Sequence, residues 1–467
     1  MPEKRAREHS TGEPVAKLRD PADKNREALQ ALETGLEDEF IGPTEDISDS
    51  ESVADPPVAE TERPDNGETP KEFWNPKDRV EGELDYDSRA YKMFYRLTCE
   101  LPCLSLDVIP DSLGALRVDP PHSADVVAGS QNEEGDNCLY FMRWSNLLST
   151  TTDGVDSDAE SESDMEEARM AASRAPHSGV VNRVRVCPQV PRVVATWSSE
   201  AAVHLLDCKE AVDALARGGK RVQTPTLHSV TDFSDEGYGL AWSPHVQGLL
   251  AAGSCDGRVV LLKPVEGGWV QDYTSRVCHD ASVEDIDFKR TGDGQEFVMV
   301  TASVDRSIRI WDLRNPEQPA AQITDAHASD VNVISCNPIQ GFLILSGGDD
   351  GALRVWDIRR TDRKLASLQW HSEPISSVQW HPSDESVFGC AALDDIVSVW
   401  DLSVEPDETG LLKKIGADAL PDQLLFTHMG QSHVSEIRWH PQIETCLCST
   451  AASGFNIFQP NFRDVNQ

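Results

Sequence analysis

Three short segments recur along the chain: Ile310-Trp311-Asp312, Val355-Trp356-Asp357 and Val399-Trp400-Asp401. In each case an aspartate stands six residues before the tryptophan, at Asp305, Asp350 and Asp394. The tryptophans recur about every 45 residues, which is the length of one four-stranded blade in a radial β-propeller. The repeat therefore predicts an all-β propeller. Such a fold has no reaction of its own, so its function must come from its faces and its inserted segments.

Strand patterns on both sides of these repeats extend the prediction to seven WD-repeat blades. Blades one, two, three and seven are expected over residues 88–148, 177–206, 239–262 and 437–458, and blades four to six end at the three tryptophans. Seven lies within the usual range of four to eight blades, and such a ring is closed by pairing strands from the two ends of the domain. The whole propeller is expected to span residues 70–467.

Two sets of side chains mimic a catalytic triad. One set is His279, Thr301, Asp305 and Trp311, and the other is His327, Ser346, Asp350 and Trp356. Because the same spacing repeats in successive blades, a buried structural network explains it better than a single oriented nucleophile. In blade six Cys390 takes the hydroxyl position, which predicts a weaker network there. The sequence contains neither a phosphate-binding glycine loop nor a His-Glu-x-x-His zinc motif, so we expect no enzyme, no cofactor and no metal.

The chain is strongly acidic, with a formal net charge of −38 from 80 Asp and Glu against 42 Lys and Arg. DNA and RNA would repel such a polyanion, so we expect no direct nucleic-acid binding and favour a basic protein partner. The alternative is that the acidity serves solubility alone. No apolar run reaches the roughly 18 residues of a membrane span, and the first residues lack the apolar core of a signal peptide. The 11 cysteines include no Cys-x-x-Cys pair, which predicts free thiols in a reducing compartment.

Two segments hold much of the acidity. Residues 1–69 are rich in Glu, Asp, Pro and Ser and cannot bury enough apolar surface to fold, so we expect them to be disordered. The second segment, 151–169, carries seven acids within residues 156–167 and is expected to loop into solvent between blades one and two. Three of its serines have an acid three residues later, which is typical of acid-directed kinase sites: Ser157, Ser161 and Ser163.

Segments outside the generic repeat resemble known families. Residues 91–107 resemble the helix and first strand that introduce the propellers of histone-binding WD-repeat chaperones. Residues 424–428, 439–441 and 451–458, together with the acidic insertion and the phrase Val181-Asn-Arg-Val-Arg-Val186, resemble the glutamate-rich WD-repeat family of ribosome-biogenesis regulators. The resemblance covers roughly residues 73–458. The chain departs from that family in its short, serine-containing acidic insertion and in the missing Trp-Asp pairs of blades two and seven.

The resemblance implies a nuclear and nucleolar chaperone, with some cytoplasmic pool, that escorts a basic large-subunit ribosomal protein to pre-60S particles. The charge of the chain favours the same role, because an acidic escort screens dense positive charge until ribosomal RNA displaces it. A histone-binding chaperone or chromatin-complex subunit is the alternative. A second alternative is a substrate receptor of a ubiquitin ligase, indicated by Trp311-Asp-Leu-Arg314 and Trp356-Asp-Ile-Arg359. A closed ring leaves few free strand edges, so we expect a monomer. We also expect no association with membranes, because no apolar run is long enough to span one.

Two partner sites are predicted from blade geometry and from the resemblance. The first is an acidic ring around the central channel, unless these are simply solvated loop acids: Glu284, Asp330, Asp349, Glu373 and Glu436. The second follows the histone-binding relatives, in which a site lies between the introductory helix and a loop before the last blade. Here that loop spans 403–424, and its acids would face Phe94 and Leu101 and hold an amphipathic helix: Glu405, Asp407, Glu408, Asp418 and Asp422. The alternative role of Phe94 is to anchor the introductory helix.

Overall fold

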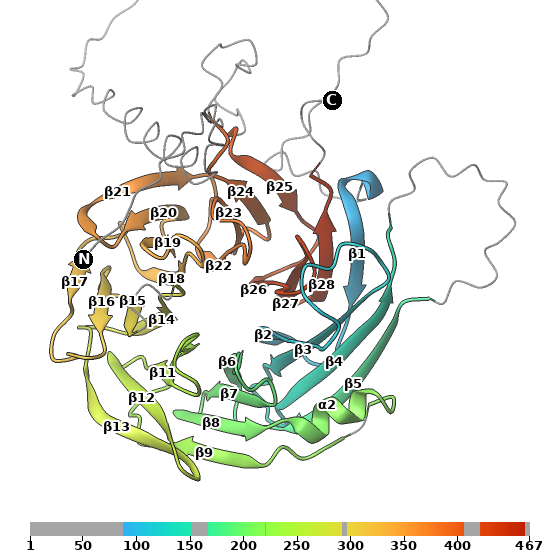
Figure 1. The fold of residues 1–467 in the computed structure, drawn as a ribbon, viewed down its shortest axis with the longest axis horizontal. Helices are drawn as coiled ribbons and strands as arrows, with labels where there is room; N and C mark the ends of the chain where they lie inside the picture. The colour runs from blue at the N-terminus through green and yellow to red at the C-terminus, as the bar shows by residue number, and fades with distance from the viewer. Residues whose placement is uncertain (1–86, 151–166, 220, 292–296, 406–420, 463–467) are drawn as a thin grey trace, which may run out of the picture. The chain divides into compact units, whose positions relative to one another are not determined.

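The computed structural model describes residues 87–150, 167–219, 221–291, 297–405 and 421–462 (Figure 1). The chain divides into residues 1–72 and 73–467, and every described residue belongs to the second unit. In that unit, seven four-stranded antiparallel sheets surround a central channel. The predicted all-β, seven-bladed propeller is confirmed.

The strands of the first six blades follow one another outward from the channel. The first three blades are β2 (Cys103–Ile109), β3 (His122–Ser130), β4 (Cys138–Leu147), β5 (Arg169–Pro176); β6 (Val181–Val186), β7 (Val193–Ser198), β8 (Ala202–Asp207), β9 (Thr226–Val230); and β10 (Gly239–Trp242), β11 (Leu250–Gly253), β12 (Arg258–Val265), β13 (Gly268–Val277). The next three are β14 (Val283–Phe288), β15 (Val298–Ser303), β16 (Ile308–Asp312), β17 (Ala321–Ile323); β18 (Val331–Cys336), β19 (Leu343–Gly348), β20 (Ala352–Asp357), β21 (Arg360–Gln369); and β22 (Ile375–Trp380), β23 (Val387–Ala392), β24 (Val397–Asp401), β25 (Leu424–His428).

The seventh blade takes its strands from both ends of the propeller. It contains β26 (Val434–Trp439), β27 (Leu447–Ala451) and β28 (Gly454–Pro460), and its outermost strand is β1 (Tyr91–Leu97). Strand β1 runs antiparallel to β28, with Phe94 opposite Phe458 and Leu97 opposite Phe455. This pairing closes the ring, as the sequence analysis expected. Blade one therefore begins at Cys103, because the segment before it belongs to blade seven.

The helix predicted within residues 91–107 is wrong. That stretch forms β1 and β2, and only a single 3-10 turn, Ser88–Ala90, precedes them. Strand β1 buries Tyr91, Met93 and Phe94 while it supplies the fourth strand of the last blade, which a helix cannot do. Residues 1–86, including the predicted disordered segment, lie outside the described part of the chain. Among the described residues the one α-helix is α2 (Lys209–Leu215), between β8 and β9, and no helix is long and apolar enough to cross a membrane.

The innermost strands have no strand beyond them, so N–H groups on their channel edge need other acceptors. Polar side chains of the preceding blade supply many of these acceptors. The Asp287 carboxylate accepts from Cys336 N at 2.8 Å, and Gln379 accepts from Trp439 N at 2.7 Å. The Glu436 carboxylate of blade seven accepts from Leu106 N of blade one at 2.9 Å. The same kind of hydrogen bond therefore also joins the last blade to the first. Adjacent blades are thus joined by side-chain to backbone hydrogen bonds as well as by apolar packing.

The triad-like residues form buried hydrogen-bonded chains. In the fourth blade, Thr301 Oγ1 lies 2.7 Å from His279 Nε2 and accepts from Trp311 Nε1 at 2.9 Å, while His279 Nδ1 lies 2.9 Å from Asp305 Oδ2. The fifth blade repeats the arrangement: Ser346 Oγ joins His327 and Trp356, and His327 joins Asp350. Both histidines are buried, and burial lowers their pKa values. In both blades this geometry ties the loop before the first strand to the second and third strands.

The weaker network predicted for blade six is wrong, because the hydroxyl comes from a neighbouring strand. Ser398 on β24 lies directly opposite Cys390 on β23. Its Oγ lies 2.8 Å from His371 Nε2 and accepts from Trp400 Nε1 at 2.8 Å, while His371 Nδ1 lies 2.9 Å from Asp394 Oδ2. The network is therefore complete, with the hydroxyl moved one strand outward.

The Ser398→Ala variant should lower the free energy of unfolding by about 1–3 kcal/mol, because the buried Trp400 and His371 nitrogens lose their partner. Denaturant unfolding followed by tryptophan fluorescence would measure the change. Adding Cys390→Ser to that variant should recover part of the loss, because it restores the arrangement of the fourth and fifth blades. If Ser398→Ala is as stable as the wild-type protein, this hydroxyl does not hold the blade together.

Candidate partner-binding faces

The propeller has two faces that differ in their loops. We call the face on which the innermost strands begin the upper face and the face on which they end the lower face. Because every sheet is antiparallel, loops between blades and loops between second and third strands lie on the upper face. The other loops lie on the lower face. This assignment places each predicted site residue on one face or the other.

The upper face is acidic in every blade from the first to the sixth. Arg306 is the one Lys or Arg in its loops, all of which the structure describes, and it forms an ion pair with Asp325 at 3.0 Å. The acids that are not part of a His-Asp network are Glu100, Glu133, Glu134, Asp136, Glu200, Asp232, Asp235, Glu236, Asp256, Asp280, Asp325, Asp330, Asp349, Glu373 and Asp395. The described lower-face loops are mixed in charge and include Arg192, Lys209 and Arg217. Among the described loops, acids are therefore concentrated on the upper face.

Three of the predicted ring acids form a cluster on the upper face. Asp349 N donates to Asp330 O at 3.1 Å, and the Asp349 side chain accepts from Asn332 Nδ2. Burial raises the pKa of Asp330, and the nearby Asp349 carboxylate raises it further. Burial also raises the pKa of Glu284, and the charge of Asp330 adds to the rise. These like charges repel one another, so a bound cation would relieve the repulsion.

Glu373 is exposed in the loop before β22, on the same face as this cluster. The structure thus places Glu284, Asp330, Asp349 and Glu373 around one end of the channel.

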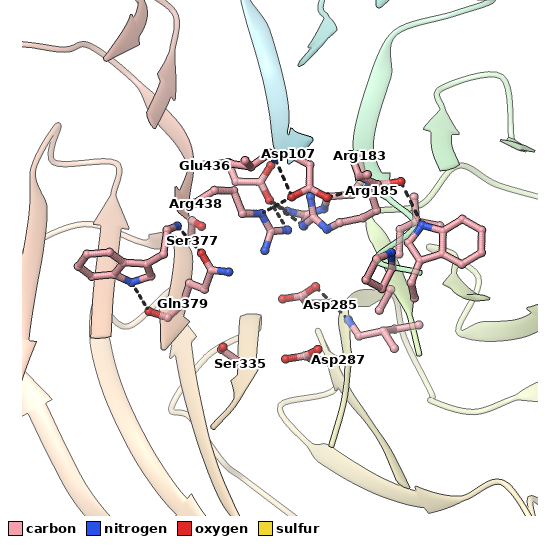
Figure 2. Close-up of a pocket in the computed structure, with 18 of the residues that line it drawn as sticks. Asp107, Arg183, Arg185, Asp285, Asp287, Ser335, Ser377, Gln379, Glu436 and Arg438 are labelled. Atoms are coloured by element: carbon pink, nitrogen blue, oxygen red, sulfur yellow. Dashed lines mark hydrogen bonds and ion pairs between the residues drawn. The ribbon is translucent and has the colours of Figure 1, made fainter. Parts of the chain in front are cut away.

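Glu436 is not a member of the ring, and its prediction as a partner-binding acid is corrected. Its side chain is 2 % exposed and points into the channel, where Figure 2 shows it among arginines. Glu436 Oε1 pairs with Arg185 Nη2 at 2.7 Å, Arg183 Nη1 at 3.0 Å and Arg438 Nη2 at 3.2 Å. Its Oε2 accepts from Ser105 Oγ and Leu106 N. Every lone-pair direction is occupied, so this carboxylate has a structural role.

The electrostatics of the channel follow from this crowding. Burial alone would raise the pKa of Glu436, but attraction to Arg185, Arg438 and Arg183 holds it well below its usual range. Burial and the charge of Arg185 lower the pKa of Arg438. Asp107 lies 3.9 Å from Arg438 Nε and accepts from Val186 N. A cavity of about 290 Å³ adjoins these groups and reaches Asp285, Asp287 and Arg290 on the side of β14 (Figure 2).

The second predicted site is not assembled as expected. Phe94 is 6 % exposed and packs with Tyr91 and His428 between blades six and seven, so it anchors β1 and is closed to a partner. Leu101 packs in a different cluster, between blades seven and one. It precedes β2 on the upper face, whereas the loop 403–424 joins β24 to β25 inside blade six on the lower face. Of that loop, Glu405 and Asp422 are exposed, while Asp407, Glu408 and Asp418 lie outside the described residues.

The acidic insertion is also placed differently from the prediction. It joins β4 to β5, the third and fourth strands of the first blade, so it interrupts blade one and does not lie between blades one and two. A connection at the outer rim can be lengthened without disturbing the contact with the neighbouring blade. Ser157, Ser161 and Ser163 lie outside the described residues, and their phosphorylation stays a prediction.

The residues of the ligase pattern have partners within their own blades. Arg359 pairs with Asp357 at 2.6 Å and stacks 3.6 Å above the ring of Phe342, and Arg314 pairs with Asp312 at 2.6 Å. These contacts give both arginines a role in the blade.

Sequence reasoning missed the arginines of the channel. Arg183 and Arg185 alternate on β6, so both point to the same side, and Arg438 stands two residues after Glu436 on β26. Paired charges with a spacing of two on a predicted innermost strand were the signal that could have revealed them. The phrase that contains Arg183 and Arg185 was noted only for its family resemblance.

The fold and these faces define a WD-repeat propeller that presents binding surfaces. The family profile described as "WD domain, G-beta repeat" matches residues 272–312, 319–357 and 362–401. A second profile, which describes the histone-binding protein RBBP4 and a component of the CAF1 complex, matches residues 81–148.

Three relatives share most of their length with this chain. The ribosome assembly protein rrb1 of Schizosaccharomyces pombe is 36% identical over 92% of this chain and 92% of its own length. The protein HEAT STRESS TOLERANT DWD 1 of Arabidopsis thaliana is 34% identical over 84% and 92%, respectively. The glutamate-rich WD repeat-containing protein 1 of Dictyostelium discoideum is 35% identical over 84% and 85%. This chain therefore belongs to the family of ribosome assembly protein rrb1 and glutamate-rich WD repeat-containing protein 1.

The Glu436→Gln variant should lower the free energy of unfolding by about 3–5 kcal/mol, because three buried guanidinium groups lose their shared carboxylate.

The contribution of Glu436 to the free energy of unfolding has a defined pH dependence. Because its pKa is lower in the folded than in the unfolded protein, its stabilising effect is complete well above the unfolded value of about 4.3 and is lost progressively as the pH falls from there through the much lower folded pKa. Denaturant unfolding of the wild-type and Glu436→Gln proteins over a series from pH 7 down to about pH 2 would measure both effects, because most of the stabilisation persists at pH 4. The matched control is Glu373→Gln, an exposed acid whose loss should change stability by less than about 0.5 kcal/mol. Equal effects of the two variants would contradict the structural role of Glu436.

Proposed function

We propose that this chain is a ribosome-assembly factor that binds a strongly basic protein of the large ribosomal subunit and delivers it to pre-60S particles. The observation that carries the proposal is the concentration of acids in the upper-face loops, where six blades present carboxylates and Arg306 is the one Lys or Arg. Kinship with the ribosome assembly protein rrb1 supports the assignment of ribosome assembly. The site of action would then be the nucleus and nucleolus, with a cytoplasmic pool in which new ribosomal protein is met.

The mechanism is electrostatic screening. A ribosomal protein that will coat RNA carries dense positive charge, which attracts nucleic acid non-specifically until it is covered. The upper face offers a field of opposite sign that speeds capture, and ribosomal RNA displaces it at the assembly site because RNA has the higher charge density. The Glu284, Asp330 and Asp349 cluster would contribute most per residue, because a cation there relieves existing repulsion. The function is binding and release, with no catalysed reaction.

A histone chaperone is the second candidate, because the profile of histone-binding proteins matches residues 81–148. Histones present the same excess of positive charge, so the upper face alone does not discriminate between the two cargoes. The ribosomal candidate is favoured because the relatives that match along most of the chain include a ribosome assembly protein. The two candidates differ in cargo and share one physical mechanism.

Affinity purification of the tagged full chain at moderate salt, with nuclease added, should recover one large-subunit ribosomal protein in near-equal amount. The remaining ribosomal proteins should be absent, because an escort holds its cargo before assembly. Mass spectrometry of the bound fraction makes the measurement. Recovery of histones in place of a ribosomal protein would select the second candidate, and recovery of whole particles alone would argue against an escort.

Charge reversal on the upper face should slow capture of that cargo. The double variant Asp330→Lys, Asp349→Lys should reduce the association rate roughly tenfold at low salt and flatten its salt dependence, because steering depends on the summed field. Stopped-flow association with the recovered ribosomal protein would measure this. The matched control reverses two exposed lower-face acids, Glu266→Lys and Asp384→Lys, and should change the rate less than about twofold. Equal effects of both pairs would show that net charge, and not the upper face, governs capture.

A further inference from the structure

The lower face carries an apolar patch on the loop between β2 and β3. Leu113 is 64 % exposed, Leu116 is 63 % exposed and Val118 is 52 % exposed. These are the three most exposed large apolar side chains among the described residues, and they fall within six consecutive positions. Scattered surface leucines need no explanation, but three together on one loop of a highly charged protein do.

The loop is held firmly in place by the last blade. The Gln442 side chain donates to Asp111 O at 2.9 Å and to Gly114 O at 3.2 Å, and it accepts from Asp111 N at 2.8 Å. The backbone of Arg117 donates to Gln442 O and accepts from Glu444 N at 3.0 Å. The Arg117 side chain pairs with Asp111 across the loop at 2.8 Å. The apolar side chains are therefore presented by an ordered backbone, which reduces the entropic cost of binding a partner.

Leu116 adopts a backbone conformation that leucine disfavours. Its φ angle is +55°, in the left-handed region that suits glycine or asparagine. Such strain persists only where the surroundings impose it, and it is found most often at functional sites. Here the strain turns an apolar side chain into solvent, so it brings no packing in return. An asparagine at this position would suit the backbone and the solvent better, which indicates that the leucine serves a contact.

The charges beside the patch indicate what it binds. Asp119 follows the patch, and the backbone of Glu444 donates to the Arg117 carbonyl, between Leu116 and Val118; both acids are exposed. A second copy of this chain would bring these acids against each other and add the repulsion of two −38 charges. A segment with apolar residues flanked by Lys or Arg would bury the apolar side chains of the patch and would also pair with the acids.

We propose that Leu113, Leu116 and Val118 form a docking site for an amphipathic, basic segment of a partner protein. The site lies on the opposite face from the acidic cluster of Glu284, Asp330 and Asp349, so it is distinct from the proposed escort site. A partner docked there would leave the upper face open, and the propeller could hold its cargo and a second protein together.

The test uses the full chain and a synthetic peptide of about 14 residues of Leu and Lys at amphipathic helical spacing. The control peptide has each Leu replaced by Ser and so retains only the charge. The Leu116→Asn variant should bind the Leu-Lys peptide roughly tenfold more weakly or worse at physiological salt, because burial of the leucine is lost. Its melting temperature should equal or exceed that of the wild-type protein, because asparagine accepts the left-handed backbone. A lower affinity therefore cannot be ascribed to unfolding.

Two further variants separate this site from other sources of binding. Leu393→Asn removes an exposed leucine of the upper face and should leave peptide affinity unchanged. The double variant Asp330→Lys, Asp349→Lys should also leave it within about twofold, so failure of the escort proposal would not affect the outcome. Equal binding of the Leu-Lys peptide by wild type and Leu116→Asn would overturn the proposal. It would also be overturned if sedimentation showed a wild-type dimer that Leu116→Asn dissociates, because the patch would then serve self-association.

Discussion

The structure depends on how the channel edge of each innermost strand is satisfied. Seven strands converge there without a strand beyond them, and an unpaired buried N–H group costs as much as a lost hydrogen bond. Asp285, Asp287 and Gln379 solve the problem by reaching across to the next blade. At each of these positions a side chain of one blade accepts from a backbone N–H of the following blade, so the hydrogen bonds run in one direction round the ring. The channel is consequently polar although the blades on either side pack through apolar cores.

Glu436 faces an innermost strand, β6, that carries hydrogen-bond donors in place of acceptors. Strand β6 carries Arg183 and Arg185 at positions where β14 carries aspartates, so it has cations to be neutralised. Glu436 neutralises them from across the closure of the ring, and it also caps β2 through Leu106 N. One carboxylate thus links the last blade to the first two. The arginines neutralise the negative charge of Glu436 inside the protein, whereas the charges of Asp330 and Glu373 remain at the surface.

The strands build the scaffold in the same way in every blade, whereas the charges of the loops differ between the two faces. Strand direction is the same in every blade, so all loops of one kind meet on one face and a bias in their composition becomes a bias of the whole face. Among the described loops, carboxylates gather on the upper face, while those of the lower face are mixed in charge and present the apolar residues Leu113 and Leu116. The long connections, at 148–168, 208–225 and 402–423, all join third to fourth strands, so none of them leaves from the upper face.

The number of blades and most residues of the hydrogen-bonded networks were predictable from the amino-acid sequence, because these follow from a repeat whose spacing is local. Four acids of the upper face could be located in the same way, because each lies on or near a strand that the repeat defines: Glu284, Asp330, Asp349 and Glu373. Tertiary structure decided the rest. Tyr91 and Phe94 became part of a strand because the last blade, distant in sequence, lacked one, and Ser398 replaced Cys390 because the two lie opposite each other across a strand pair. Glu436 became structural because two of its arginines come from β6, about 250 positions away. Contacts between residues so far apart leave no periodic trace in the chain, and only the closed ring brings them together.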